Sequence, residues 1–396
     1  MNISPPPVFH LMAKPRGAIC NLDCAYCYFL SKEKLYPGSD FRMGDDVLEK
    51  YTRQFIESQR VPEVTFSWQG GEPTLMGLEF FERALHFQKK YARPGMKIHN
   101  ALQTNGVTLN AEWCKFFGDN KFLIGLSLDG PRQIHDGYRK DKGGQPTFER
   151  VMCGLHLLQE HKVEFNTLTT IHALNVEYPL DVYHFLRDEV KSAFMQFIPI
   201  VERDNETGYQ QGRKVTKRSV GGRQYGEFLT VIFDEWVRRD VDRVYVQIFD
   251  AALGAWLGHP GSLCIFAPIC GTALALEHNG DVYACDHYVE PKFLLGNMVE
   301  TDLSALVASP QLAKFGRDKL EKLPRYCQNC AVRFACHGGC PKNRILRTPG
   351  GEPGLNYLCE GYKHFFTHID TPMKTMAALI RQGRHPAEVI NLLKKG

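Results

Sequence analysis

The 396-residue sequence has no long hydrophobic run and no large excess of charge of one sign. No apolar stretch approaches the roughly 18 residues that suggest a membrane helix, and prolines stand near the start, in 1–7, where a signal peptide needs an apolar core. We therefore expect a cytoplasmic protein that binds no membrane. The formal net charge of +4 is too small to indicate nucleic-acid binding, and 43% hydrophobic and 23% charged residues exclude disorder, collagen and coiled coil for the whole chain.

Cysteine, in contrast, is abundant. An odd number, thirteen, in a chain without a secretion signal argues against a disulfide framework, and clustered thiols in a reducing compartment more often hold metal. Cys114 and Cys153 stand alone in apolar helical patterns, so we expect both to pack in the core. The others form an N-terminal cluster and a C-terminal group: Cys20, Cys24 and Cys27, then Cys264, Cys270, Cys285, Cys327, Cys330, Cys336, Cys340 and Cys359.

Short apolar runs alternate with amphipathic helical patterns from about residue 9 to residue 239. A spacing of about 30 residues per strand–helix unit predicts an α/β fold with a parallel sheet, and six units could close partly into a (β/α)6 TIM-like barrel. Active-site groups of such a fold gather at the C-terminal ends of strands. The predicted strands are 10–14, 64–68, 98–103, 122–128, 163–171 and 194–200, and examples of predicted helices are 77–91 and 147–161.

The character of the sequence changes after about residue 244, where cysteines and turn residues increase. We place a boundary between residues 239 and 263. This predicts a barrel domain over 1–240 and a smaller cysteine-rich domain with C-terminal helices over 241–396.

The first cysteine cluster has the spacing C-x3-C-x2-C over Cys20, Cys24 and Cys27. Three thiolates on one loop can hold three irons of a four-iron cluster and leave the fourth iron open for chemistry. Structural zinc is the alternative, and it would need a fourth ligand nearby, for which His10 is the only near candidate.

This motif, with Tyr26 before its last cysteine, resembles the cluster loop of the radical S-adenosylmethionine (SAM) superfamily. The resemblance implies that the open iron binds the methionine part of SAM and that an electron from the cluster cleaves SAM to a 5′-deoxyadenosyl radical. The Gly-Gly-Glu turn at 70–72 resembles the motif that binds the SAM amino group. Glycine there lets the backbone approach a ligand closely.

The C-terminal cysteines include the dense run C-x2-C-x5-C-x3-C over 327–340. Paired C-x2-C spacing also suits zinc, but eight cysteines could ligate two further four-iron clusters. The spacing resembles the SPASM extension of peptide-modifying radical SAM enzymes, and only this resemblance implies a pairing. One cluster would take Cys264, Cys270, Cys285 and Cys340, and the other Cys327, Cys330, Cys336 and Cys359.

From about residue 8 to residue 362 the sequence is similar to the anaerobic sulfatase-maturating enzymes, over 20–27, 69–75, 102–106, 125–131, 281–289 and 354–359. The resemblance implies oxidation of a cysteine or serine in an unfolded or nascent sulfatase to Cα-formylglycine. It further implies three 4Fe-4S clusters, SAM and an electron donor such as flavodoxin or ferredoxin. The implied SAM contacts are Tyr26, Gly71, Ser127, Arg139 and Met195. Alternatively, Ser127 could cap a turn and Arg139 could form a surface ion pair.

Asp286, directly after Cys285, is the candidate catalytic base. A turn aspartate is usually solvated or capping, and the family resemblance is what assigns it a role. After loss of hydrogen from the substrate Cβ, the carbon radical must lose a proton and an electron. A carboxylate beside an oxidised cluster could accept the proton, and the cluster could accept the electron. The carboxylate would have to lie within hydrogen-bond reach of the substrate heteroatom.

Three other functions compete with sulfatase maturation. Another SPASM peptide maturase is disfavoured because only nineteen residues precede Cys20, too few for the recognition domain that such enzymes often carry. A three-cluster electron carrier would need neither the Gly-Gly-Glu turn nor an open iron. A zinc-stabilised interaction protein is the third. The sequence does not decide between cysteine and serine substrates, and it does not identify the reductant or the oligomeric state.

Overall fold

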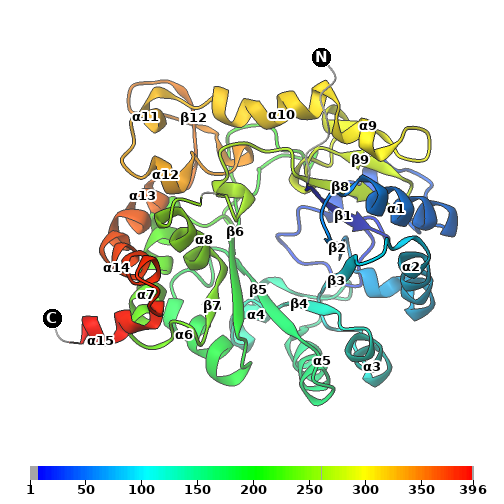
Figure 1. Ribbon diagram of the computed structural model, residues 1–396, viewed down its shortest axis with the longest axis horizontal. Helices are drawn as coiled ribbons and strands as arrows, with labels where there is room; N and C mark the ends of the chain where they lie inside the picture. Colours follow the sequence, from blue (N-terminus) through cyan, green and yellow to red (C-terminus); the bar gives the residue numbers. More distant parts are fainter. Residues whose placement is uncertain (1–7, 260, 395–396) are drawn as a thin grey trace.

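A ten-stranded sheet forms the centre of the protein. The computed structural model describes residues 8–259 and 261–394, and the start of the chain, 1–7, on which the signal-peptide prediction rests, lies outside them. The strand order is β10-β9-β8-β1-β2-β3-β4-β5-β6-β7, with helices around the strands (Figure 1). The strands are β1 (His10–Lys14), β2 (Glu63–Trp68), β3 (Lys97–Thr104), β4 (Leu123–Ser127), β5 (Phe165–Ile171), β6 (Phe194–Pro199), β7 (Tyr245–Val246), β8 (Ala273–Glu277), β9 (Asp281–Tyr283) and β10 (Leu294–Asn297).

Helices alternate with the strands as the sequence pattern predicts. The barrel helices are α1 (Asp45–Ser58), α2 (Leu78–Tyr91), α3 (Ala111–Asp119), α4 (Arg132–Tyr138), α5 (Phe148–Glu160), α6 (Pro179–His184) and α7 (Gly222–Arg239). The C-terminal helices are α8 (Gln247–Trp256), α9 (Leu303–Val307), α10 (Pro310–Glu321), α11 (Arg325–Gln328), α12 (Arg333–Cys336), α13 (Cys359–His368), α14 (Asp370–Arg381) and α15 (Val389–Leu393). None of the helices in the described ranges combines the length and apolar character needed to cross a bilayer.

Strands β1 to β7 pair in parallel with their neighbours, which confirms the predicted α/β partial barrel. The C-terminal ends of parallel strands meet at one edge of the sheet. The cysteine loop follows β1, the Gly-Gly-Glu turn follows β2, and the turns 104–106 and 127–130 follow β3 and β4. The fold therefore brings these four motifs to the same end of the barrel.

The sheet continues into the cysteine-rich segment. Strand β8 pairs in parallel with β1, with Lys14 opposite Glu277, and β9 and β10 add antiparallel strands. This pairing gives hydrogen-bond partners to the backbone groups on the outer edge of β1, which would otherwise be unpaired. The division into 1–240 and 241–396 stays a prediction, because strands from both parts share one sheet.

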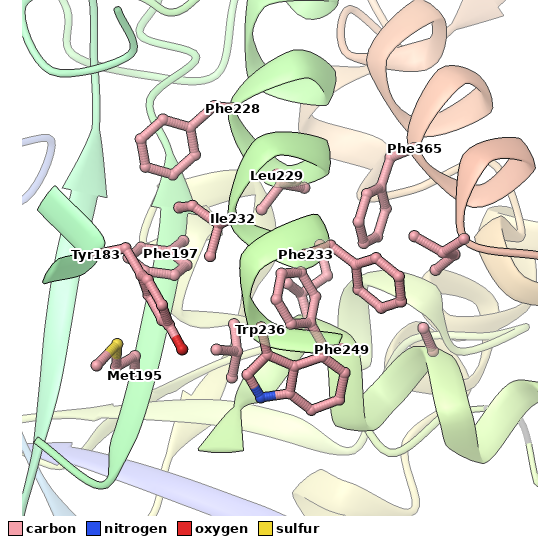
Figure 2. Packing of buried hydrophobic residues seen from close by; sticks show 14 of the residues in the cluster. Tyr183, Met195, Phe197, Phe228, Leu229, Ile232, Phe233, Trp236, Phe249 and Phe365 are labelled. Atoms are coloured by element: carbon pink, nitrogen blue, oxygen red, sulfur yellow. The ribbon is translucent and has the colours of Figure 1, made fainter. Parts of the chain in front are cut away.

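Helix α7 carries the aromatic core that joins β6 to the C-terminal helices. Figure 2 shows Phe233 and Trp236 of α7 between Met195 of β6 on one side and Phe249 and Phe365 of α8 and α13 on the other. The side chains of all five residues are buried. Full burial of such side chains contributes about 1.5–3 kcal/mol each, so this cluster fixes α13 against the barrel.

The two solitary cysteines differ in their surroundings. Cys114 is buried in α3, as predicted, whereas the prediction for Cys153 was wrong because its side chain is exposed. Helix α5 buries the face that carries Val151, Leu155 and Leu158, and Cys153 lies off that face.

Candidate active site

The loop after β1 holds the first three cysteines as free thiols. Burial, with smaller contributions from the neighbouring charges of Glu72, Cys24 and Cys27, raises the pKa of Cys20 to about 12. Burial also raises the pKa of Cys24 to about 11, with Cys27 again contributing. The three sulfur atoms therefore lie close enough to interact. A bound metal would hold such thiols as thiolates and offset this cost.

The structure brings no fourth ligand to this loop from His10. His10 begins β1, whereas the loop begins after Lys14 at the other end of that strand. A rise of about 3.3 Å per residue separates the two strand ends by about 13 Å. In the described ranges no three His, Cys, Asp or Glu side chains converge to hold a single metal ion. An iron–sulfur cluster needs no such convergence, since each thiolate binds its own iron.

The Gly-Gly-Glu turn is tied directly to the cysteine loop. The Gly71 N–H donates to the Gly17 carbonyl at 2.8 Å, and the Glu72 N–H donates to the Ile19 carbonyl at 2.9 Å. The buried Glu72 carboxylate in turn accepts from the Asn105 N–H at 2.8 Å. The main chain of the turn therefore binds the cysteine loop after β1, and the Glu72 carboxylate binds the end of β3, so that the ends of β1, β2 and β3 are held together.

Replacing Gly71 with alanine should disrupt this junction. A Cβ built on Gly71 would lie 2.0 Å from the Ile19 carbonyl oxygen, so the turn or the loop must move. We expect a loss of about 1–3 kcal/mol or more in unfolding free energy, as overpacking typically costs, and loss of SAM binding. Denaturant unfolding and equilibrium SAM binding measure the two effects. Gly350→Ala is the control, because its Cβ would meet nothing closer than 3.9 Å; equal effects at both positions would contradict the argument.

Tyr26 and Arg139, two predicted SAM contacts, lie together. The Tyr26 hydroxyl donates to Asp129 at 2.5 Å and accepts from Arg139 Nη1 at 2.8 Å. Arg139 is only 6% exposed, which excludes the surface ion pair considered above. Its Nε has no hydrogen-bond partner among the described residues. A buried donor of this kind at the barrel mouth suits a polar ligand. Burial alone would raise the pKa of Asp129, but Arg139 and His172 lower it to about 2.

Ser127 and Met195 occupy different surroundings. Ser127 ends β4, and its hydroxyl accepts from Gln103 Nε2 at 2.9 Å. Met195 in β6 is fully buried in the core against the helices (Figure 2). Strand alternation turns its side chain away from the barrel interior, so any contact of Met195 with SAM is made by its main chain. The SAM contacts stay predictions.

Asp286 lies beside the cysteine loop. One carboxylate oxygen forms an ion pair with Lys14 Nζ, and the other accepts from the Tyr28 hydroxyl at 2.5 Å. Burial would raise the pKa of Asp286, but Lys14, His287 and Tyr28 together lower it below its ordinary value. The carboxylate is therefore ionised near neutral pH, the state that a base requires.

Sequence reasoning missed Lys14 and Tyr28. The Lys14 side chain is 1% exposed, donates to Gln69 Oε1 at 2.9 Å and lies 4.4 Å from the centre of the Phe29 ring. Both residues had a weak signal in the sequence, because Lys14 ends a predicted strand and Tyr28 directly follows the last cysteine of the motif. These contacts place Asp286 between β1, β2 and the cysteine loop.

The pKa shifts of the C-terminal cysteines indicate which of these thiols influence one another. Burial raises the pKa of Cys264, Cys270 and Cys285, and the charge of Cys340 raises the pKa of all three further. Likewise, burial raises the pKa of Cys336 and Cys359, with Cys327 and Cys330 adding to the shift in both. Charges influence one another most strongly at short range, so these effects support the proposed pairing, which stays a prediction. The role of these cysteines as iron ligands stays a prediction.

A barrel with an open three-cysteine loop and a cysteine-rich extension defines a radical SAM protein. The family model described as the Radical SAM superfamily matches residues 15–186, and the SPASM model, described as an iron-sulfur cluster-binding domain, matches residues 264–331. Both imply that the chain uses iron–sulfur clusters and SAM.

Similarity to individual proteins narrows this class. The sequence is 44% identical to the serine-type anaerobic sulfatase-maturating enzyme of Bacteroides thetaiotaomicron, over 98% of this chain and 95% of that enzyme. It is 34% identical to the cysteine-type enzyme of Clostridium perfringens, over 91% of this chain and 96% of that enzyme. A solved structure of native anSMEcpe with bound AdoMet and Cp18Cys peptide superposes with a TM-score of 0.84 and 33% identity, over 94% of this chain and 99% of that one. The chain therefore belongs to the anaerobic sulfatase-maturating enzymes and is a radical SAM enzyme.

Proposed function

We propose that this enzyme oxidises a serine or cysteine of an unfolded or nascent sulfatase polypeptide to Cα-formylglycine. The observation that carries the proposal is the ionised Asp286, held by Lys14 and Tyr28 between the cysteine loop and Cys285. Oxidation of the substrate Cβ requires a proton acceptor at the thiol or hydroxyl, and an ionised carboxylate at the barrel mouth can serve. The full-length similarity to sulfatase-maturating enzymes supports the same conclusion.

Three 4Fe-4S clusters and SAM are the cofactor set that we propose. The first cluster is held by Cys20, Cys24 and Cys27, with SAM held by Tyr26, Gly71, Ser127, Arg139 and the main chain of Met195. The other clusters are held by the two C-terminal groups of four cysteines. When bound, these groups supply hydrogen-atom abstraction and electron uptake. The chain itself orients the peptide and takes the substrate proton on Asp286.

The test is anaerobic incubation with SAM, a reductant and two sulfatase-motif peptides, one with serine and one with cysteine at the modified position. Mass spectrometry should show the loss of two hydrogens from the serine peptide, or the replacement of the thiol by an aldehyde oxygen in the cysteine peptide. The higher identity to the serine-type relative leads us to propose that the serine peptide is accepted. SAM cleavage without formylglycine in either peptide would favour another SPASM peptide maturase.

Iron content tests the cofactor set. Three four-iron clusters predict about twelve irons per chain after anaerobic reconstitution. Cys340→Ala should remove or disturb the cluster of Cys264, Cys270 and Cys285, and the matched control Cys153→Ala, which removes an exposed cysteine, should change nothing. Iron and sulfide analysis with electron paramagnetic resonance measures both variants. About four irons plus zinc in the wild type would identify the extension as a zinc module.

The electron donor and the cellular location of the enzyme are also proposals. A ferredoxin- or flavodoxin-type donor would supply the electron, and the enzyme would act in the cytoplasm on its polypeptide substrate, without nucleic acid or membrane. Supporting observations are the absence of a membrane-crossing helix in the described ranges and the small net charge of +4.

A further inference from the structure

Two cations lie among the C-terminal cysteines, the buried Lys319 and the half-buried Arg344. Lys319 of α10 is 1% exposed, and its ammonium donates to the carbonyls of Cys264 at 2.8 Å and Ile265 at 3.0 Å. The Arg344 guanidinium donates to the carbonyls of Lys319 at 2.5 Å and His337 at 3.0 Å. Within the ranges that the structure describes, neither side chain forms a salt bridge with a carboxylate.

Cysteine side chains of the two C-terminal groups lie near both cations. Burial lowers the pKa of Lys319, and Cys270, Cys340 and Cys264 oppose that effect. Lys319 therefore lies against the first C-terminal group of cysteines. Burial also lowers the pKa of Arg344, which is opposed by Cys327 and Cys336 of the second group and by Cys270 and Cys340 of the first. Its hydrogen bonds to the carbonyls of His337 and Gly338 place Arg344 against the segment that joins Cys336 of the second group to Cys340 of the first.

The two carbonyls that Lys319 binds accept its hydrogen bonds but supply no counter-charge. The neighbouring lysines are on the outside: Lys314 of α10 and Lys322, directly after its last residue, are 65% and 67% exposed and pair with Asp318. Burying an ammonium without a counter-charge is costly, and an apolar side chain would pack without that cost. Among the described residues no carboxylate pairs with this buried ammonium, which lies beside thiols that are candidate cluster ligands. This arrangement points to a negative group that those thiols hold.

We propose that Lys319 and Arg344 are counter-charges built into the fold for the two C-terminal iron–sulfur clusters, and that they raise the reduction potentials of those clusters. The inference rests on the proposed cofactor set. A cluster held by four thiolates gains negative charge on reduction, so a nearby fixed cation favours the reduced state. Lys319 acts on the cluster of Cys264, Cys270 and Cys285, and Arg344 acts on both clusters. Both are positioning residues that act through the clusters.

The test measures reduction potentials rather than turnover. The variants Lys319→Gln and Arg344→Gln remove a charge, Lys319→Arg and Arg344→Lys keep it, and Lys314→Gln is the control that removes an exposed charge from the same helix. Anaerobic potentiometric titration with electron paramagnetic resonance is performed on each reconstituted variant, with iron counted in the same sample. Placing all variants on a background lacking the first three cysteines leaves only the C-terminal clusters in the spectrum.

We expect Lys319→Gln to lower the reduction equilibrium constant of one cluster about tenfold, which is about 59 mV for one electron. Arg344→Gln should shift both clusters, the charge-keeping variants should restore most of the shift, and Lys314→Gln should not move either cluster. Loss of the cluster in Lys319→Gln but not in Lys319→Arg would also support the counter-charge, because the positive charge would then be needed for the cluster to assemble.

Full iron content with unchanged reduction potentials in the two glutamine variants would overturn this inference and leave the proposed cofactor set intact. Loss of the cluster in both Lys319→Gln and Lys319→Arg would overturn the inference too, because cluster binding would then depend on the packing of the lysine and not on its charge. Wild-type protein without C-terminal iron would overturn the cofactor set together with this inference. Formylglycine formation plays no part in the measurement, so a different peptide substrate would leave the result intact.

Discussion

Replacing Cys20, Cys24 and Cys27 together with alanine is expected to abolish SAM cleavage while the C-terminal iron stays bound. These thiols are the only cysteines on the loop after β1, so their loss leaves no ligand there for a cluster. The eight C-terminal cysteines are untouched, and about eight irons should remain per chain. Formation of 5′-deoxyadenosine and iron content are measured on the same anaerobic sample.

The loop should keep its shape without the thiols. The Asp23 N–H donates to the Lys140 carbonyl at 2.8 Å, and the Ala25 N–H donates to the Tyr138 carbonyl at 3.0 Å. These main-chain bonds do not depend on sulfur. Cys153→Ala serves as the control for the loss of a thiol elsewhere on the barrel. Full SAM cleavage by the triple variant would refute the assignment of the SAM cluster, and loss of all iron would show that the two cluster regions do not assemble independently.

The barrel was predictable because its signals are local. Each strand of the barrel from β1 to β6 contains apolar residues in a short run or in alternation, and each is followed by a turn rich in glycine or polar residues. Helices α2 and α5 lie within one residue of the predicted boundaries at each end. The cysteine spacing of the loop over 20–27 is likewise contained in eight residues. Local pattern is sufficient wherever a motif and its element are contiguous.

The rest of the site depends on contacts across long sequence separations. Tyr28 and Asp286 are 258 residues apart, and they meet only because β8 pairs with β1. Strands β8 and β9 stand among cysteines and turns, outside the strand–helix repeat that marks the barrel strands in the sequence. The contacts of Lys14 and Lys319 could not be predicted either, because nothing in the sequence marks a lysine as buried.

Asp286→Asn is expected to slow formylglycine formation by about 10²–10⁴-fold, the usual cost of losing a general base. Asparagine keeps the size and shape of the side chain but cannot accept the substrate proton. The predicted SAM contacts are other residues, so SAM binding and cleavage should survive. Uncoupled 5′-deoxyadenosine formation can therefore continue, since hydrogen abstraction precedes the need for a base. The decisive quantity is product formed per SAM cleaved.

The ion pair with Lys14 makes a matched control necessary. Removing one partner of a buried pair typically costs about 3–5 kcal/mol, because Lys14 keeps a buried charge without its carboxylate. A folding defect of that kind would lower iron content and SAM binding together with product. Tyr28→Phe is the control: it removes the hydrogen bond to Asp286, at about 0.5–1.5 kcal/mol, and keeps the carboxylate. It should retain most of the coupling between SAM cleavage and product. If Asp286→Asn equals the wild type in both rate and coupling, Asp286 is only a turn residue, and the base is another group at the barrel mouth.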